Sequence, residues 1–206
     1  VDGRFSAVVP SPQPRTVTIA ASDTAGNRTV AEQPVTVSPR RPPAPLRGVH
    51  VSAAAWANAP LRRGILDLIA AHRINAVELD IKDESGIAGW NPPVARSRQI
   101  GAAQSVYDLG AAVRLLHGLG VRVIGRVVCF RDPILARAAW ERGQRGQVVQ
   151  TPSRTAYAAY GGFTNVASPA VRAYNIAIAV AAARAGVDEI LYDYVRRPDG
   201  PIRTMR

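Results

Sequence analysis

Two hydrophobic periods divide the chain, and the first is that of β-strands. Apolar and polar residues alternate in the run Thr16–Ala20, which is the two-residue period of a strand. A turn-forming Asp-Thr-Ala-Gly-Asn segment follows at 23–27, and a second extended run covers 28–37. The pattern predicts an antiparallel hairpin, whose two or three strands are too few to bury a core alone.

Strand and helix patterns alternate after residue 47. Apolar strand runs and the helical stripes between them occupy 48–52, 60–72, 76–81, 105–119, 121–128, 168–185 and 187–192. Ser105 and Asp108 form a variant capping box that predicts the start of the second helix. Strands separated by helices predict right-handed βαβ units in a parallel sheet. Four such units fit a doubly wound sheet or half of a (β/α)8 barrel, and the 160 residues from 47 to 206 are fewer than the ~250 of a full barrel.

A proline-rich segment separates the two patterns. Residues 39–46 contain four prolines, which favour an extended backbone with few hydrogen-bond donors. We therefore expect a β fragment at 1–38, a linker at 39–46 and an α/β domain at 47–206.

The chain is strongly basic, with 26 basic and 15 acidic residues among 206 and a net charge of +11. Of the bases, 25 are arginines, a preference typical of GC-rich genomes, and Lys82 is the single lysine. The arginines are scattered over predicted helix faces and only 6% of residues are aromatic, so specific nucleic-acid binding is not expected. A nonspecific attraction to acidic cell-wall polymers needs no motif and stays open.

The sequence lacks the motifs of common cofactor and metal sites. No glycine-rich phosphate loop, His-Glu-x-x-His or calcium loop occurs, and the single Cys129 excludes an internal disulfide or a cysteine-built metal site. We expect neither cofactor nor metal. No apolar run reaches the ~18 residues that a membrane span needs, and no signal-peptide pattern opens the sequence.

Charged and polar residues collect where the predicted parallel strands end. Ligands of parallel α/β folds sit at the carboxyl ends of the strands. The candidates at or after those ends are Asp80, Asp83, Glu84, Arg126, Asp132, Asp193, Tyr194 and Arg196. A mixed acid–base rim of this kind could orient a multi-hydroxyl substrate, and paired carboxylates could hydrolyse a glycosidic bond. Polar residues also belong at exposed strand ends for structural reasons alone, so the pattern leaves both interpretations open.

Three further residues are candidates on weaker grounds. Lys82 stands between Asp80 and Asp83, where a compact ammonium can be buried between carboxylates. His50 lies on the first strand of the α/β domain and points either to the helices or to the opposite face, and Trp90 lies in a long loop where its ring could stack on a sugar.

Four motifs in order resemble a bacterial glycoside-hydrolase barrel family whose activity is itself inferred. They are Asp-x-Lys-Asp at 80–83, Arg126, Phe-x-Asp-Pro at 130–133 and Asp-Tyr-x-Arg-x-Pro at 193–198. The resemblance spans 47–198 and implies a (β/α)8 barrel of which this chain carries about four βα units, with the remaining units beyond Arg206. Arg197 replaces the aromatic of the last motif, and the segment 163–169 lacks the usual Trp and Asp-Pro.

The resemblance assigns roles to the rim. By analogy with retaining barrel glycosidases, Asp193 is the catalytic nucleophile, and the proton donor follows a fifth strand beyond Arg206. The substrate-binding candidates are His50, Asp80, Lys82, Asp83, Trp90, Arg126, Asp132, Tyr194 and Arg196. Asp132 fits a helix-capping turn as well as a ligand.

The amino-terminal segment resembles the last strands of a bacterial immunoglobulin-like repeat, through Asp2–Ser6 and the strand and turn at 16–27. Together the two resemblances imply an extracellular or cell-envelope hydrolase that acts on a cell-wall or extracellular polysaccharide, and of which this chain is a part. The alternative is a non-catalytic carbohydrate-binding protein on the same scaffold. A metal-dependent deacetylase is disfavoured by three scattered histidines.

Overall fold

The computed structural model describes residues 15–35, 45–200, 203 and 205. The chain divides into two units, Val1–Ala44 and Pro45–Arg206. Residues 1–14 and 36–44 lie outside the described residues. They include the Asp2–Ser6 segment and most of the predicted linker.

The described part of the first unit is the predicted hairpin. Strands β1 (Arg15–Ser22) and β2 (Arg28–Val35) pair antiparallel. The turn is fixed by Asp23, whose Oδ1 accepts the amides of Ala25 and Asn27. Nearly all of its described side chains are exposed, as expected for a pair of strands without a second layer.

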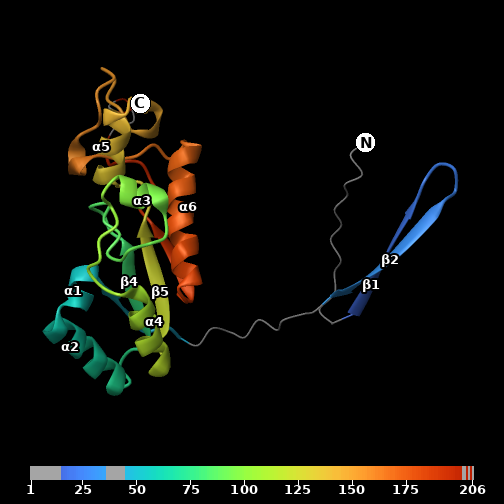
Figure 1. Cartoon of the computed structure of the whole chain (residues 1–206), viewed down its shortest axis with the longest axis horizontal. Helices are drawn as coiled ribbons and strands as arrows, with labels where there is room; N and C mark the ends of the chain where they lie inside the picture. Colours follow the sequence, from blue (N-terminus) through green and yellow to red (C-terminus); the bar gives the residue numbers. More distant parts are fainter. Residues whose placement is uncertain (1–14, 36–44, 201–202, 204, 206) are drawn as a thin grey trace. The chain divides into compact units, whose positions relative to one another are not determined.

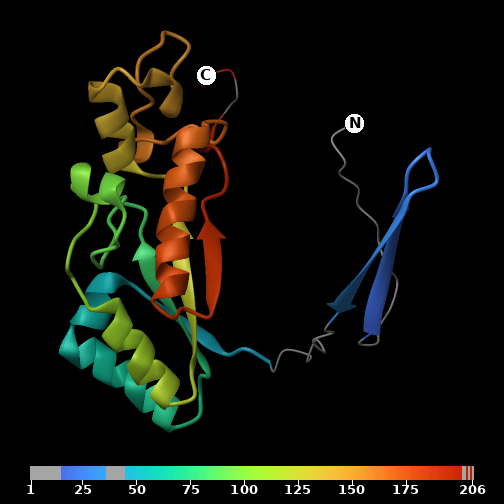
Figure 2. The same ribbon diagram turned by 45° about the vertical axis from the view of Figure 1, so that its right-hand side comes forward.

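The second unit alternates strands and helices as predicted (Figures 1 and 2). Its strands are β3 (Gly48–Val51), β4 (Ala76–Lys82), β5 (Arg122–Val128) and β6 (Glu189–Asp193). Its α-helices are α1 (Ala53–Ala57), α2 (Ala59–Ala70), α3 (Ala95–Gln99), α4 (Leu109–Gly118), α5 (Pro133–Glu141) and α6 (Pro169–Arg184). Short 3-10 turns lie at η1 (Arg145–Gln147) and η2 (Ala159–Gly161).

Side-chain caps mark where the main helices begin. Ser168 caps α6, as its Ser-Pro sequence indicates, and Asp132 caps α5. The expectation for α4 was wrong by three residues, because Asp108 rather than Ser105 is the capping residue, accepting the Ala111 amide at 2.9 Å. None of the helices in the described ranges is long and apolar enough to cross a membrane.

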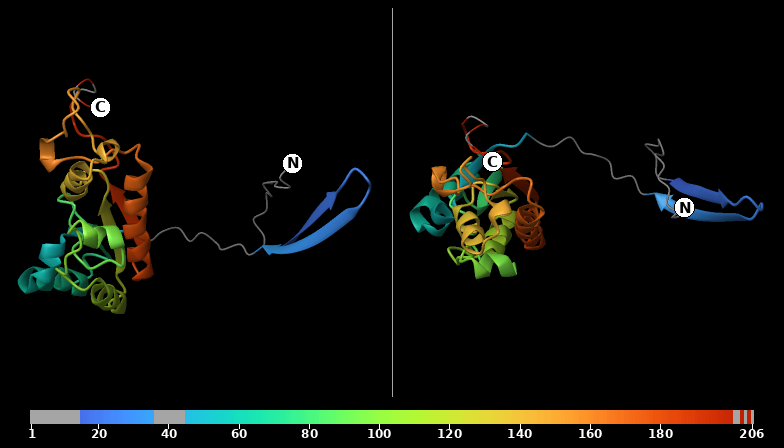
Figure 3. Two further views of the ribbon diagram at one scale, coloured as in Figure 1. Left: turned by 45° about the horizontal axis from the view of Figure 1, so that its top comes forward. Right: turned by 90° about the horizontal axis from the view of Figure 1, so that it is seen from above.

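Within residues 45–200 the four strands form one parallel sheet in the order β3-β4-β5-β6, which confirms the predicted strand order. Right-handed crossovers between neighbouring strands place the connecting helices on the same side. Figure 3 shows α2, α4 and α6 arrayed along one face of the sheet. The other face is therefore free of helices from this unit.

Alternation along the strands gives the two faces different chemistry. Val77 and Leu79 of β4 and Val123 and Val127 of β5 pack with the buried residues of α4 and α6. The residues between them on the strands point to the opposite face, and they include the charged residues His50, Glu78, Asp80, Arg126 and Asp193. The core thus lies between sheet and helices, and the charges lie on the bare face.

A β-bulge interrupts this alternation at the end of β4. Asp80 pairs with Arg126, but Lys82 pairs with Val127, so one extra residue is inserted between Asp80 and Lys82. The extra residue turns Lys82 to the helix side, where its Nζ lies 5.5 Å from the ring centroid of Tyr174 on α6.

Candidate active site

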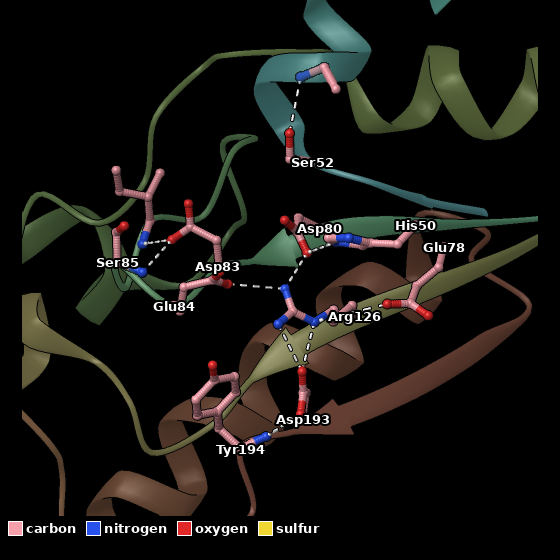
Figure 4. Close-up of polar contacts among 12 residues, drawn as sticks. His50, Ser52, Glu78, Asp80, Asp83, Glu84, Ser85, Arg126, Asp193 and Tyr194 are labelled. Atoms are coloured by element: carbon pink, nitrogen blue, oxygen red, sulfur yellow. Dashed lines mark hydrogen bonds and ion pairs between the residues drawn. The ribbon is translucent and has the colours of Figure 1, made fainter. Parts of the chain in front are cut away.

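The guanidinium of Arg126 is the centre of the charged face (Figure 4). Its Nη1 donates to Asp80 at 2.8 Å and to Glu84 at 3.1 Å, and its Nε and Nη2 each lie 2.8 Å from Oδ2 of Asp193. Glu78 lies farther away, with 3.9 Å between its Oε1 and Nε of Arg126. We call His50, Glu78, Asp80, Glu84, Arg126 and Asp193 the Arg126 cluster.

The cluster holds one guanidinium among carboxylates from two strands and a loop. Burial, which leaves Arg126 8% exposed, would lower its pKa, but the hydrogen bonds that it donates to Asp80 and Asp193 outweigh burial and raise it. Arg126 is therefore positively charged. A single positive charge facing Glu78, Asp80, Glu84 and Asp193 leaves the cluster negatively charged overall.

His50 belongs to this cluster. It points away from the helices, and its Nε2 lies 2.9 Å from Oδ1 of Asp80. Its imidazole is about half exposed, with 48% of the side chain accessible, whereas Asp80 is buried. The exposed part of the imidazole can therefore contact a bound molecule at the rim.

Asp193 ends β6 and is held as a carboxylate. Burial would raise its pKa, but hydrogen bonds from the Tyr194 amide and from Arg126 overcome this and lower it. The Tyr194 amide donates to Oδ1 of Asp193 at 2.6 Å, and Tyr194 adopts a left-handed backbone with φ of 50°. An ionised carboxylate suits a nucleophile, a general base or a stabiliser of positive charge, and not a proton donor.

The loop after β4 carries two carboxyl groups with opposite properties. Oδ1 of Asp83 accepts the amides of Ser85 and Ile87, which closes a tight turn. Burial nevertheless raises the pKa of Asp83, helped by the charges of Asp80 and Glu84. For Glu84, burial is overcome by hydrogen bonds, including the one from Arg126, and the pKa is lowered.

Lys82 and Asp132 do not join the cluster, contrary to the expectation that both bind substrate. Nζ of Lys82 donates to Oδ2 of Asp132 at 2.6 Å, and both side chains are 0% exposed. The bulge directs Lys82 into the core, and Asp132 also caps α5 by accepting the Leu135 amide. A sealed pair of this kind is a structural element, and no ligand reaches it in this arrangement.

Trp90 also lies away from the cluster. It is 7% exposed and packs in the main core. It borders a surface pocket of about 620 Å³ that Tyr107 and Asp108 also line, on the α4 side of the sheet. The predicted stacking of a sugar on Trp90 therefore has no support in the position of the ring.

Tyr194 and Arg196 form a second group at the rim, with two residues that the sequence did not single out. The guanidinium carbon of Arg196 lies 4.8 Å from the Tyr194 ring centroid, and that of Arg131 lies 5.7 Å from the same ring. Arg131 also lies 5.3 Å from the ring centroid of Tyr160. We call Tyr160, Arg131, Tyr194 and Arg196 the Arg131 stack.

The structure thus brings His50, Asp80, Arg126 and Asp193 together, with Asp83, Tyr194 and Arg196 near them. Glu84 was expected at the strand ends but was assigned no role, and Glu78 was not among the predicted residues. The alternation of β4 could have found Glu78, which shares a face with Asp80 two residues later. Across the described residues, no group of three or more His, Cys, Asp or Glu is placed to hold a metal ion.

A parallel sheet with a charged cluster at the carboxyl ends of its strands defines an α/β domain of the class that binds polar ligands at that edge. Within this class, residues 48–206 match the sequence family described as "Putative glycosyl hydrolase domain", and the chain belongs to that family. No curated protein matches the chain.

One solved structure shares the fold of the second unit. A hypothetical protein from Ruminiclostridium thermocellum is similar over 77% of this chain and 80% of its own, at 28% identity and a TM-score of 0.69. Two larger proteins match more distantly, an alpha-galactosidase from Lactobacillus brevis (13% identity, TM-score 0.43) and a cycloalternan-degrading enzyme from Trueperella pyogenes (13%, 0.42). These matches cover 71% and 70% of this chain but only 20% and 24% of the respective proteins. Similarity this low carries no argument about activity.

Proposed function

We propose that this chain is part of a glycoside hydrolase that acts on a bacterial cell-wall or extracellular polysaccharide. The observation that carries the proposal is the Arg126 cluster, in which carboxylates of two strands and a loop meet at the carboxyl ends of a parallel sheet. Membership of a glycosyl hydrolase family supports the reaction class. Hydroxyl-rich substrates need such alternating donors and acceptors for orientation, and glycosidic bonds are hydrolysed by paired carboxyl groups.

We further propose that the four βα units are half of a (β/α)8 barrel. Sequential strand order with the helices on one face is the arrangement of barrel strands, whose other face lines the barrel interior and carries the polar site at its carboxyl end. Strands β3 and β6 lie at the two edges of the sheet, where further strands could add. The hairpin before them is proposed to belong to an immunoglobulin-like repeat.

In the proposed reaction Asp193 acts as the ionised carboxylate, either as nucleophile or as base. Arg126 keeps it charged and fixes its orientation through two donors, while Asp80 and Glu84 hold the guanidinium from its other side. A second, protonated carboxyl must deliver a proton to the leaving oxygen, from ~5–5.5 Å away in a retaining enzyme and ~6.5–9.5 Å in an inverting one.

The proton donor is proposed to follow a fifth strand outside this chain, and Asp83 is the candidate inside it. Its raised pKa is the property that a general acid needs. The two candidates predict different results. If Asp83 is the donor, Asp83→Asn removes hydrolysis of substrates with poor leaving groups. If a carboxyl on a fifth strand is the donor, Asp83→Asn leaves most of the activity.

The test is hydrolysis of a panel of bacterial polysaccharides by this chain and by a longer gene product that contains it. We expect activity in the longer product, little in the chain alone, and a loss of at least ~10²-fold in Asp193→Asn, the lower end of what a proton-transferring group contributes. Asp188→Asn is the matched control, because Asp188 accepts the Val123 amide near the amino-terminal end of β5, away from the cluster. Equal activity of Asp193→Asn and its parent would overturn the assignment.

A specific observation favours the alternative of a non-catalytic carbohydrate-binding protein. Asp80, Glu84 and Asp193 all already bond to Arg126, as they would in a purely structural ion network. Saccharide binding that Asp193→Asn weakens, with no product formed from any polysaccharide by the longer product, would establish this alternative.

Location and longer-range attraction are part of the proposal. We propose that the protein acts outside the cell or in its envelope, where a polysaccharide substrate and an immunoglobulin-like neighbour are typical. The net charge of +11 would favour encounter with acidic wall polymers, an effect that rising salt would weaken.

A further inference from the structure

Arg131 contacts two aromatic rings at the same rim as the Arg126 cluster. It follows β5, and its guanidinium carbon lies 5.3 Å from the ring centroid of Tyr160 and 5.7 Å from that of Tyr194. The Tyr194 ring also contacts Arg196, at 4.8 Å. Cation–π contacts of this kind fix the plane of a guanidinium without using its hydrogen-bond donors.

The donors of Arg131 are largely unused. Its Nη1 donates to the Tyr194 hydroxyl at 3.3 Å, while its Nε is buried with no partner among the described residues. No carboxylate of the described chain lies within 4.0 Å of its guanidinium, in contrast to Arg126 and to Arg196, which pairs with Asp199. Because Nε is buried, the donors of Arg131 left for a ligand are those of Nη1 and Nη2.

Both tyrosines of the stack hold an unusual backbone. Tyr160 has φ of 56° and Tyr194 has φ of 50°, a left-handed region that aromatic residues seldom adopt. Tyr160 lies in η2 and Tyr194 follows β6, so two separate segments are bent to bring rings to one guanidinium. Such backbone outliers cluster at ligand sites, because the fold maintains them only where surrounding contacts enforce them.

The stack is continuous with the proposed catalytic group. The amide of Tyr194 donates to Asp193, and the charge of Arg131 helps to lower the pKa of Glu84 in the Arg126 cluster. Tyr160 is 53% exposed and Arg131 only partly buried, so the stack is open to solvent. A saccharide that reaches Asp193 would therefore extend over Arg131.

We propose that Arg131 binds the carboxylate of an acidic sugar, so that the substrate is a uronate-containing polysaccharide. The terminal Nη1–Nη2 edge of a guanidinium can face the two oxygens of a planar carboxylate, and its fixed plane favours this bidentate geometry. The Tyr160 ring offers an apolar surface for the sugar that carries the carboxylate. This inference rests on the proposed function, since it assigns a substrate class to the same rim.

The test compares charged and neutral forms of the same polymers. Polygalacturonate, alginate and hyaluronate, each with a carboxyl-reduced counterpart, are titrated into the full chain and binding is measured by calorimetry. We expect at least one uronate polymer to bind more tightly than its reduced form. In Arg131→Gln that affinity should fall at least ~10-fold, the size of one charge-assisted hydrogen bond, while affinity for the reduced polymer stays unchanged.

Arg145→Gln is the matched control. Arg145 also stacks on an aromatic ring, 4.9 Å from Trp140, and its replacement changes the net charge by the same amount. Equal losses in Arg131→Gln and Arg145→Gln would show that only the overall charge attracts the polymer, and would overturn the proposal. Arg131-dependent binding of sulfated or phosphorylated glycans in place of uronates would also overturn it.

An Arg131→Lys variant and hydrolysis assays distinguish uronate recognition by Arg131 from its effects on folding and from the proposed reaction. Arg131→Lys keeps the charge without the fork, and should restore thermal stability but not uronate affinity. Uronate affinity fully restored by lysine would contradict the bidentate geometry. If uronate binding depends on Arg131 but no form of the protein hydrolyses any polymer, the proposed hydrolase activity is wrong and the uronate site is supported. If only neutral polymers are hydrolysed, independently of Arg131, the hydrolase activity is supported and the uronate site is wrong.

Discussion

Arg126 and Lys82 lie on neighbouring strands, β5 and β4, but their charged groups have contrasting environments. Arg126 shares its charge among several carboxylates, three of which are partly exposed, whereas Lys82 is sealed with Asp132 alone. The exposed arrangement can rearrange around a ligand. The sealed one cannot lose a partner without leaving a buried charge, which costs far more than the pair contributes.

The buried pair leads to a stability prediction. Lys82→Met should lower the free energy of unfolding by about 3–5 kcal/mol, because it strands the Asp132 carboxylate at 0% exposure. The double variant Lys82→Met with Asp132→Asn keeps the helix cap and should recover part of the loss. Urea denaturation measures both. Arg63→Met is the control, since Arg63 and Asp67 form an exposed pair on α2, and it should change stability by less than ~1 kcal/mol.

The titration of surface carboxylates gives a second prediction. Burial would raise the pKa of Asp188, but the Val123 amide and His117 overcome it, so folding lowers this pKa. Its contribution to stability is then present above its unfolded pKa of ~3.9 and is lost as the pH falls through the folded value. Asp188→Asn should be less stable than the parent at pH 6, and the difference should shrink as the pH falls below ~3.9. A difference in unfolding free energy that stays constant with pH would contradict this account.

At the residue scale, a position at the end of a predicted strand was enough to predict members of the cluster. It was not enough to predict on which face of the sheet each side chain lies. Asp80, Arg126 and Asp193 follow from strand ends alone. Lys82 could not be placed, because no local sequence signal announces the bulge that turns it to the core. The burial of Trp90 and Asp132 could not be predicted either, because it depends on tertiary packing that no periodicity encodes.

At the element scale, the alternation of apolar strands and amphipathic helices was sufficient to predict the parallel sheet and its order. Helix starts were predicted less well. Ser105 and Asp108 are both good caps, and the helix begins after Asp108. Glycine supplies a feature invisible in sequence: Gly125 lies in the middle of β5, where a Cβ would meet Ile81 and Val187 at 2.9 and 3.0 Å.

Close packing at Gly125 predicts a substitution effect. Gly125→Ala should lower the free energy of unfolding by about 1–3 kcal/mol, because the added methyl overpacks the layer between β5 and its neighbours. Gly118→Ala makes the same change at the end of α4, where a Cβ meets open space, and should be neutral or stabilise by up to ~1 kcal/mol. Thermal unfolding of the two variants provides the comparison. Similar effects at both sites would refute the packing argument.

At the scale of the whole molecule, apolar side chains remain exposed at one edge of the second unit. Ile176 and Val180, one turn apart on α6, are 53% and 42% exposed, and Tyr192 on the helix side of edge strand β6 is 47% exposed. An edge strand with adjoining apolar surface is a site where other chains associate. The sequence pattern predicts four βα units but not what covers their outer edge.

This edge predicts self-association. The 206-residue chain should form concentration-dependent oligomers, and Ile176→Lys with Val180→Lys should shift it toward monomer in light scattering after size exclusion. Leu61→Lys is the control, because Leu61 is an equally exposed apolar residue on α2, at the other end of the sheet. A monomeric parent at high concentration, or an equal effect of the Leu61 variant, would contradict the prediction.

The bulge in β4 also bears on how this chain can change over evolution. Because Lys82 is locked to Asp132 while Asp80 and Glu84, on either side of it, reach Arg126, the segment 80–86 is fixed at both faces of the sheet. Gly86 adds a third constraint, since its backbone, with φ of 80°, packs against the Asp132 side chain. A single inserted or deleted residue here would exchange the two faces and expel a charge from the core. Length variation among related sequences should therefore begin only after Gly86, which leaves the long loop before α3 as the place where new specificities can be built.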